Sequence, residues 1–201
     1  MGQITVEKNI YGIEGLCIVT PALHGDTRGY FMETYNENDM REAGIDIRFV
    51  QDNQSCSGKG VLRGLHFQIR YPQTKLVRVI RGSVLDVAVD LRKGSPTFGK
   101  YCGQILSEEN RKQLLIPKNF AHGFLVLSDT AEFCYKCDDF YHPNDEGGIA
   151  WNDPDIGIDW GVNGEYPGSA DPAGYTLGDG SPLIMSDKDK LLGTLAGYLR
   201  N

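Results

Sequence analysis

Two apolar runs on either side of one glycine constrain the fold of this chain more than any other stretch. Lys75-Leu-Val-Arg-Val-Ile and Val84-Leu-Asp-Val-Ala-Val-Asp-Leu are rich in β-branched residues, and Arg81-Gly82-Ser83 between them has the composition of a tight turn. The pattern predicts a β-hairpin over residues 75–91. A second hairpin is predicted from Ala121 to Cys137, with Ser128-Asp129-Thr130 as its turn.

Similar short strands, separated by turn residues, recur along most of the chain. This spacing is typical of an all-β barrel or sandwich such as a jelly roll. The second hairpin would make His122 and Tyr135 near neighbours across two strands. Short flanking helices are predicted at 36–44, which begins with an Asx cap, and at the C-terminus, where Ser186 precedes an apolar stripe of leucines. The stripe consists of Leu191, Leu192, Leu195 and Leu199.

The composition predicts one domain spanning residues 1–201 and excludes several classes of partner. Acidic residues outnumber Lys plus Arg by 27 to 20, which argues against binding to nucleic acid or to an anionic membrane through a basic surface. The N-terminus lacks an apolar secretory core and no stretch is apolar enough to span a bilayer, so we expect a soluble, cytoplasmic protein. Five cysteines at irregular spacing are expected to be free thiols.

Chemistry is suggested by the run Val61-Leu-Arg-Gly-Leu-His-Phe-Gln. On a regular strand Arg63 and His66 would point to opposite faces, but Gly64 invites a bulge that would turn both toward one cavity. The alternative is a strand with a core histidine whose hydrogen bonds are satisfied.

His66 and His122 lie in similar segments, Gly-Leu-His-Phe and Ala-His-Gly-Phe, which a barrel could bring together. One interpretation is a metal site. Metal-binding jelly rolls usually contain His-x-His with a nearby Glu, whereas position 68 here is Gln. The other interpretation is metal-free acid/base chemistry, with Tyr135 as an acid across the cavity. For a strand tyrosine such as Tyr135, a core aromatic with its hydroxyl bonded to backbone is the more common role, and Lys75 is also consistent with an exposed strand end.

A set of longer motifs, in order along nearly the whole chain, resembles the dTDP-4-dehydrorhamnose 3,5-epimerase family. The motifs are Gly25-Asp-Thr-Arg-Gly-Tyr-Phe, Phe49-Val-Gln-Asp-Asn, Val61-Leu-Arg-Gly-Leu-His-Phe-Gln, Lys75-Leu-Val-Arg-Val, Asp86-Val-Ala-Val-Asp-Leu-Arg, Ser95-Pro-Thr-Phe-Gly, Ile116-Pro-Lys-Asn-Phe-Ala-His-Gly-Phe, Glu132-Phe-Cys-Tyr-Lys and Trp151-Asn-Asp-Pro-Asp-Ile-Gly-Ile-Asp-Trp. Their combination is specific, although no single motif would be.

The resemblance implies a jelly-roll (cupin-like) homodimer that inverts C3 and C5 of a dTDP-4-keto sugar without cofactor or metal, in dTDP-L-rhamnose biosynthesis. His66 is similar to the family's base, Tyr135 to its acid and Lys75 to its lysine near the C4 oxygen. Arg28 is similar to an arginine that reaches the neighbouring subunit's site. Substrate contacts are expected at Arg28, Glu33, Gln51, Asp52, Asn53, Arg63, His122, Tyr141, Glu146 and Lys188.

The segment Ser186-Asp-Lys-Asp189 permits two roles for Asp189. In the family an aspartate in this segment orients the base histidine, and the resemblance favours that role. Alternatively, Asp189 completes a capping box with Ser186. The glycine-rich loop 161–182 looks longer than the family's compact members require.

Three other functions compete with double epimerisation. Some related enzymes invert one carbon only, and related jelly rolls move a keto group between C3 and C4. A non-catalytic nucleotide-sugar-binding module would use the same arginines without an acid and a base.

Overall fold

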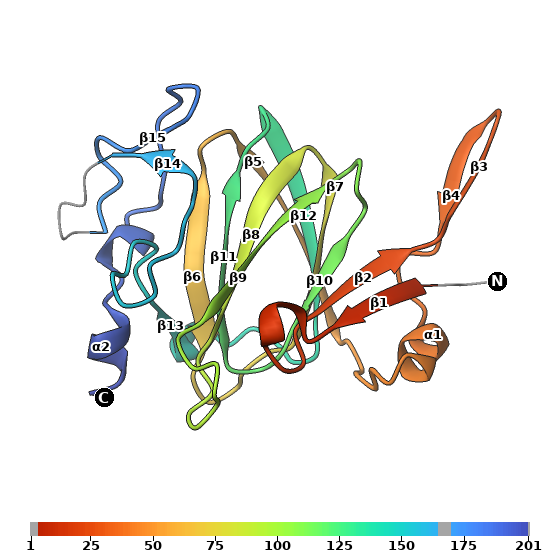
Figure 1. The fold of residues 1–201 in the computed structure, drawn as a ribbon, viewed down its shortest axis with the longest axis horizontal. Helices are drawn as coiled ribbons and strands as arrows, with labels where there is room; N and C mark the ends of the chain where they lie inside the picture. The colour runs from red at the N-terminus through yellow and green to blue at the C-terminus, as the bar shows by residue number, and fades with distance from the viewer. Residues whose placement is uncertain (1–3, 165–169, 201) are drawn as a thin grey trace.

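Two facing β-sheets form the body of the protein, as the computed structural model, which describes residues 4–164 and 170–200, shows (Figure 1). One sheet has the strand order β1-β2-β10-β7-β12-β5 and the other has the order β13-β6-β11-β8-β9. The strands are β1 (Ile4–Lys8), β2 (Cys17–Pro21), β5 (Gln51–Gly58), β6 (Leu62–Gln68), β7 (Lys75–Arg81), β8 (Ser83–Asp90), β9 (Tyr101–Ser107), β10 (Gln113–Ile116), β11 (Phe120–Val126), β12 (Thr130–Cys137) and β13 (Glu146–Gly148). The predicted all-β jelly roll is confirmed.

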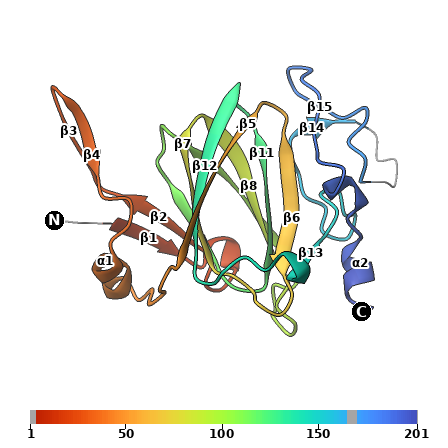
Figure 2. The same ribbon diagram turned by 180° about the vertical axis from the view of Figure 1, so that it is seen from behind.

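Smaller elements flank these sheets. The hairpin of β3 (Leu23–Asp26) and β4 (Gly29–Met32) projects from the body on the side opposite the C-terminus (Figures 1 and 2). The others are the helices α1 (Glu37–Glu42) and α2 (Leu195–Tyr198), the 3-10 turns η1 (Ile10–Gly12), η2 (Pro143–Asp145) and η3 (Asp189–Leu191), and the short pair β14 (Val162–Asn163) and β15 (Thr176–Leu177). None of the described helices is long and apolar enough to cross a membrane.

Both predicted hairpins are wrong in their pairing, although their strands are where the sequence placed them. β7 pairs with β10 and β12 in one sheet, whereas β8 pairs with β11 and β9 in the other. Gly82 alone separates β7 from β8, and its φ of +75° bends the chain from one sheet into the other. β11 and β12 also lie in different sheets, so His122 and Tyr135 are not paired along a ladder, although both line the same cavity.

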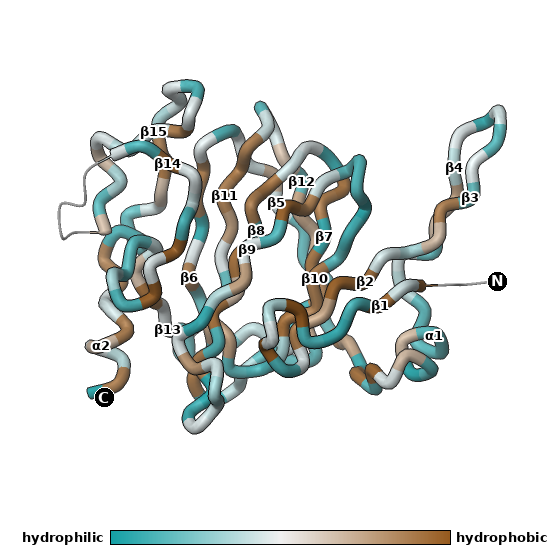
Figure 3. Tube along the Cα trace, in the orientation of Figure 1, coloured by the Kyte–Doolittle hydropathy of each residue, from teal (hydrophilic) through white to brown (hydrophobic). Residues whose placement is uncertain are grey.

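Alternating side chains divide the apolar residues into two main layers. Val77, Val79, Val84, Phe124 and Phe133 are buried between the sheets. The outer face of the β6–β11–β8 region is covered by residues from 149–160 and 170–195, including the buried Trp151 and Trp160. The apolar residues visible along β8, β10 and β11 in Figure 3 belong to these layers.

Of the two predicted helices, the structure contains the first but not the second as a continuous helix. Asn36 caps α1 through its side chain and Gly44 follows it with φ +77°, as the sequence predicts. The continuous C-terminal helix is wrong, because the chain forms only η3 and α2 with an extended break at Leu192. Leu191 is 84% exposed, so the predicted leucine stripe does not form one buried face. Of the predicted loop 161–182, residues 165–169 lie outside the described residues.

Candidate active site

A cavity of about 820 Å³ opens between the two sheets. It is lined by residues of β5, β6, β7, β11 and β12 and by residues 184–186, 188 and 189 of the C-terminal segment. His66, Lys75 and Tyr135 all lie on its wall, together with Arg63 and His122. A cavity of this volume suits a ligand of nucleotide-sugar size, since small-molecule sites commonly measure about 300–1,000 Å³.

A bulge at Gly64 brings Arg63 and His66 into this one cavity. β11 pairs His122 with His66 and Phe124 with Arg63, so β6 has one residue more than its partner strand over this interval. The extra residue shifts the alternation and turns both side chains inward, as the sequence predicted. Gly64 has φ +117°, and a Cβ there would lie 2.6 Å from the Cα of Gly123. The close approach of the two strands therefore requires glycine.

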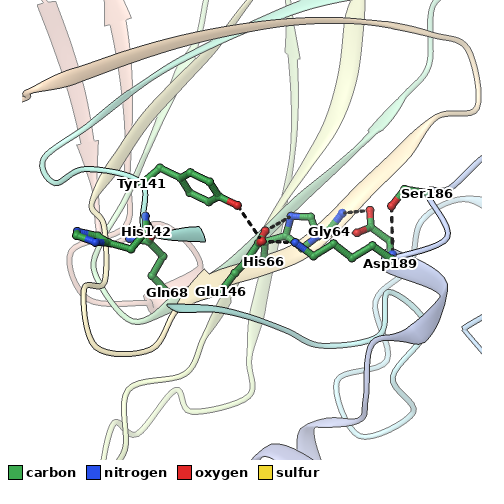
Figure 4. Close-up of polar contacts among 9 residues, drawn as sticks. Gly64, His66, Gln68, Tyr141, His142, Glu146, Ser186 and Asp189 are labelled. Carbon is green, nitrogen blue, oxygen red and sulfur yellow. Dashed lines mark hydrogen bonds and ion pairs between the residues drawn. The ribbon is translucent and has the colours of Figure 1, made fainter. Parts of the chain in front are cut away.

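Asp189 holds the imidazole of His66 from the C-terminal segment (Figure 4). Its Oδ1 lies 2.7 Å from His66 Nε2, and its Oδ2 accepts the Gly64 amide at 3.3 Å. Burial alone would raise the pKa of this carboxyl, but the bond to His66 and the Gly64 amide hold it below the usual value. An ionised carboxylate accepts the Nε2 hydrogen, so the free lone pair of the neutral ring is on Nδ1.

Of the two hydrogen bonds of a capping box between Ser186 and Asp189, only the one accepted by the Ser186 hydroxyl forms. The Asp189 backbone N–H donates to Ser186 Oγ at 3.1 Å, while the carboxylate is committed to His66 and Gly64. Ser186 therefore fixes the turn that presents Asp189 (Figure 4).

Glu146 approaches the other side of the same ring. Its Oε1 lies 3.7 Å from His66 Nδ1, while its Oε2 accepts from the Tyr141 hydroxyl at 3.1 Å (Figure 4). The same Oε2 also accepts from Lys188 Nζ. Burial disfavours the charge of Glu146, yet the bond from Lys188 keeps the pKa of this carboxyl below its ordinary value. His66 thus stands between two carboxylates.

Lys75 and Tyr135 come from the opposite sheet. Lys75 Nζ lies 6.0 Å from the centroid of the Tyr135 ring. Burial lowers the pKa of the Lys75 ammonium and raises the pKa of the Tyr135 phenol. The lysine is a desolvated donor for an oxygen entering the cavity, and the tyrosine remains a protonated acid throughout the neutral pH range.

A second buried His–Asp pair lies next to the first. His122 Nε2 is 2.9 Å from Oδ2 of Asp86, a fully buried residue on β8 whose Oδ1 has no partner within the described chain. Arg63 Nε and Nη2 donate to Ser57 Oγ at 3.2 and 3.0 Å. An imidazole and a guanidinium therefore share one wall and suit an anionic group.

The polar residues of β5 divide between its two faces. Gln51 Nε2 donates to Asn53 Oδ1 at 3.0 Å, so these two residues share a face, and Asn53 lines the cavity. Gln51 Oε1 also accepts the Tyr141 amide at 3.0 Å and so fixes the loop that carries Tyr141. The carboxylate of Asp52 is paired with Lys136 at 2.7 Å.

Arg28 and Glu33 are not brought to the cavity of their own chain. Arg28 lies at the tip of the β3–β4 hairpin, where its side chain is 87% exposed and paired with Asp26. Glu33 follows β4 and does not line the cavity. A role for Arg28 in catalysis requires a second subunit.

Sequence reasoning missed Asp86 and Ser57 as members of the site. The sequence could have indicated Asp86, because an acidic residue inside the apolar run Val84-Leu-Asp-Val has no obvious surface role. Nothing in the sequence indicated Ser57. Within residues 4–164 and 170–200, no three His, Cys, Asp or Glu side chains converge as metal ligands.

Comparison with known proteins points to one family. The family model described as dTDP-4-dehydrorhamnose 3,5-epimerase matches residues 11–197. The Escherichia coli K12 protein named dTDP-4-dehydrorhamnose 3,5-epimerase is 48% identical over 190 residues, which cover 94% of each chain.

Solved structures agree with this match. A Legionella pneumophila dTDP-6-deoxy-D-glucose-3,5-epimerase in complex with dTDP-4-keto-L-rhamnose superposes with a TM-score of 0.84 at 46% identity, covering 96% of this chain and 94% of that one. A 3'-monoepimerase from Streptomyces bikiniensis in complex with dTDP-quinovose gives a TM-score of 0.79 at 31% identity, covering 100% of this chain and 90% of that one. The same fold therefore holds enzymes described as inverting different numbers of carbons.

Proposed function

Because the chain belongs to the dTDP-4-dehydrorhamnose 3,5-epimerase family, we propose that it inverts C3 and C5 of dTDP-4-dehydro-6-deoxy-D-glucose to give dTDP-4-dehydro-L-rhamnose. The observation that carries the proposal is the meeting of His66, Lys75 and Tyr135 on the wall of one cavity, with Nε2 of the imidazole bonded to Asp189. The proposed steps use only these side chains.

Proton removal next to a ketone needs a stabilised enolate. Lys75 supplies a buried cation for the C4 oxygen, where the negative charge develops. Removing one preorganised donor of this kind typically costs about 10²–10³ in rate. The desolvation that lowers the pKa of Lys75 also strengthens its interaction with the enolate oxygen.

Inversion needs a base on one face of the sugar and an acid on the other. His66 lies on β6 of one sheet and Tyr135 on β12 of the facing sheet, so a sugar between the sheets has one group on each side. His66 Nδ1 takes the proton from carbon, and the Tyr135 hydroxyl returns one to the opposite face. Each positioned group contributes about 10²–10⁴ in rate.

The remaining lining residues suit the nucleotide. Arg63 and His122 share one wall of the cavity and can meet the diphosphate. Tyr141, which is 51% exposed, offers an aromatic ring at the edge of a smaller cavity beside His66. Gln51 and Asn53 offer amides on the same side of β5.

A homodimer would complete the site. The β3–β4 hairpin projects from the barrel (Figure 1), and its Tyr30 and Phe31 are 60% and 67% exposed, so the hairpin presents apolar surface. Arg28 at its tip would then reach the neighbouring cavity and add a cation for the diphosphate.

Deuterium labelling tests the proposal. With the dTDP-4-keto sugar in D₂O, the product should contain deuterium at both C3 and C5. Label at C3 alone would instead identify a monoepimerase like the Streptomyces bikiniensis enzyme.

A His66→Ala variant separates the enzyme from a binding module. It should bind dTDP with nearly unchanged affinity, and the sugar should incorporate no deuterium from D₂O. A variant that still exchanges both carbons would remove His66 from the mechanism.

A further inference from the structure

Two inversions on one bound sugar require the base to lose its proton between them. Each inversion transfers one proton from carbon to His66 and one from Tyr135 to carbon, which leaves an imidazolium and a phenolate. Neither group can act again until the imidazolium has lost its proton and the phenolate has gained one. Building on the proposed double epimerisation, we propose that Glu146 is the proton-relay residue that carries the proton from His66 Nδ1 to solvent between the two inversions.

Only one ring nitrogen of His66 is free to take and release this proton. Nε2 is committed to Asp189, a carboxylate that is 4% exposed and also holds the Gly64 amide. The transferred proton therefore arrives on Nδ1. Glu146 Oε1 lies 3.7 Å from that nitrogen, close enough to accept its proton after a small rotation or through one water.

The other oxygen of Glu146 faces outward. It accepts from the Tyr141 hydroxyl and from Lys188 Nζ, whereas the Glu146 side chain itself is only 15% exposed. Tyr141 is 51% exposed and the Lys188 side chain 62% exposed. The carboxylate thus joins Nδ1 of the half-buried imidazole to two groups in contact with solvent.

A second cavity behind the catalytic groups supports this route. It measures about 90 Å³ and is lined by His66, Lys75, Tyr135, Tyr141 and Glu146, among others. Polar side chains surround a space large enough to hold water, so ordered water there can serve both His66 and Tyr135. The proton that leaves through Glu146 is balanced by one that reaches the Tyr135 phenolate from water.

The charges around Glu146 favour release of a proton over its retention on the carboxylate. Lys188 favours the ionised carboxylate, so a proton taken from His66 is released quickly. Asp189 is poorly suited to this role, because its carboxylate is 4% exposed and already bonded to the N–H groups of His66 and Gly64.

A Glu146→Gln variant tests the relay, with labelled product analysed by mass during a single turnover in D₂O. The second inversion should slow by about ten- to hundredfold more than the first, so singly labelled sugar accumulates. Added imidazole buffer should restore the second inversion by replacing the lost proton acceptor. Lys188→Met, which removes one solvent-exposed contact, should show the same pattern more weakly.

Two controls separate the relay from a structural effect. Glu132→Gln alters a carboxylate on β12 that is 29% exposed and bonded to Gln54, and it should behave as wild type in all buffers. Asp189→Asn should lose both inversions equally and should not respond to buffer.

The outcomes distinguish the relay from the proposed function. Wild-type enzyme that labels one carbon or neither would refute double epimerisation itself. Wild-type enzyme that labels both carbons, together with a Glu146→Gln variant whose two inversions slow equally or ignore buffer, would overturn the relay alone. If Glu146→Gln fails to fold, the Lys188→Met result decides by the same criteria.

Discussion

Replacing Asp189 by Asn changes the number of hydrogen bonds that the partner of His66, the proposed base, can accept. The carboxylate accepts two N–H groups, from His66 at 2.7 Å and from Gly64 at 3.3 Å. An asparagine has one acceptor oxygen and one amide donor. One of the two N–H groups must therefore face a donor, at a residue that is 3% exposed.

Each orientation of the asparagine has a cost. If its oxygen accepts from His66, the buried Gly64 amide is left unpaired, which costs about 1–3 kcal/mol. If its amide donates to Nε2, the imidazole hydrogen moves to Nδ1 and blocks the atom that must take the substrate's proton. The second orientation removes the contribution of the base, about 10²–10⁴ in rate. In Ser-His-Asp hydrolases the same change costs about 10⁴ through the tautomer.

We therefore expect kcat of Asp189→Asn to fall by about 10³, or about 4 kcal/mol in activation free energy, with little change in KM. Product formation and deuterium incorporation measure the effect. Asp187→Asn is the matched control, because Asp187 lies two residues away and its side chain is 99% exposed. A folded Asp189→Asn enzyme within tenfold of wild type would refute the tautomer argument.

Other variants probe the buried lysine and the bulge. Lys75→Met should lower the rate about a hundredfold or more, measured by deuterium exchange. It should also raise the free energy of unfolding at pH 7 in urea titrations, because burial lowers the pKa of Lys75 and the fold disfavours its charge. The unfolded chain binds more protons between that lowered pKa and the ordinary lysine value, so wild-type stability should rise with pH through this window, and the rise should vanish in Lys75→Met. Gly64→Ala would place a Cβ 2.7 Å from the His122 carbonyl oxygen and should lower the melting temperature and cost about 1–3 kcal/mol or more, measured by thermal and urea unfolding.

Sequence patterns located the strands but not their partners. The runs that became β7 and β8 were recognised from their β-branched residues, and Gly82 was recognised as a turn. A glycine with positive φ serves a hairpin and a sheet-to-sheet crossing equally well, because both reverse the chain direction. The choice depends on contacts with β10, β11 and β12, which are distant in sequence.

The site was predictable where local geometry sets it. The inward turn of Arg63 and His66 follows from a glycine in a strand, so the bulge could be read from the sequence alone. The partner of His66 could not, because Asp189 is 123 residues away and local spacing pointed equally to a helix cap. Only the family resemblance favoured the contact that the structure contains.

The crossing of the chain at Gly82 has a consequence for folding kinetics. β7 and β8 are adjacent in sequence but belong to opposite sheets, as do β11 and β12, so local contacts alone cannot build either sheet. Non-local pairing of this kind slows folding, because the chain must close long loops first. His66 and Tyr135, the proposed base and acid, come from different sheets, so under this proposal catalytic activity reports the docking of the two sheets, whereas β-structure can form before it.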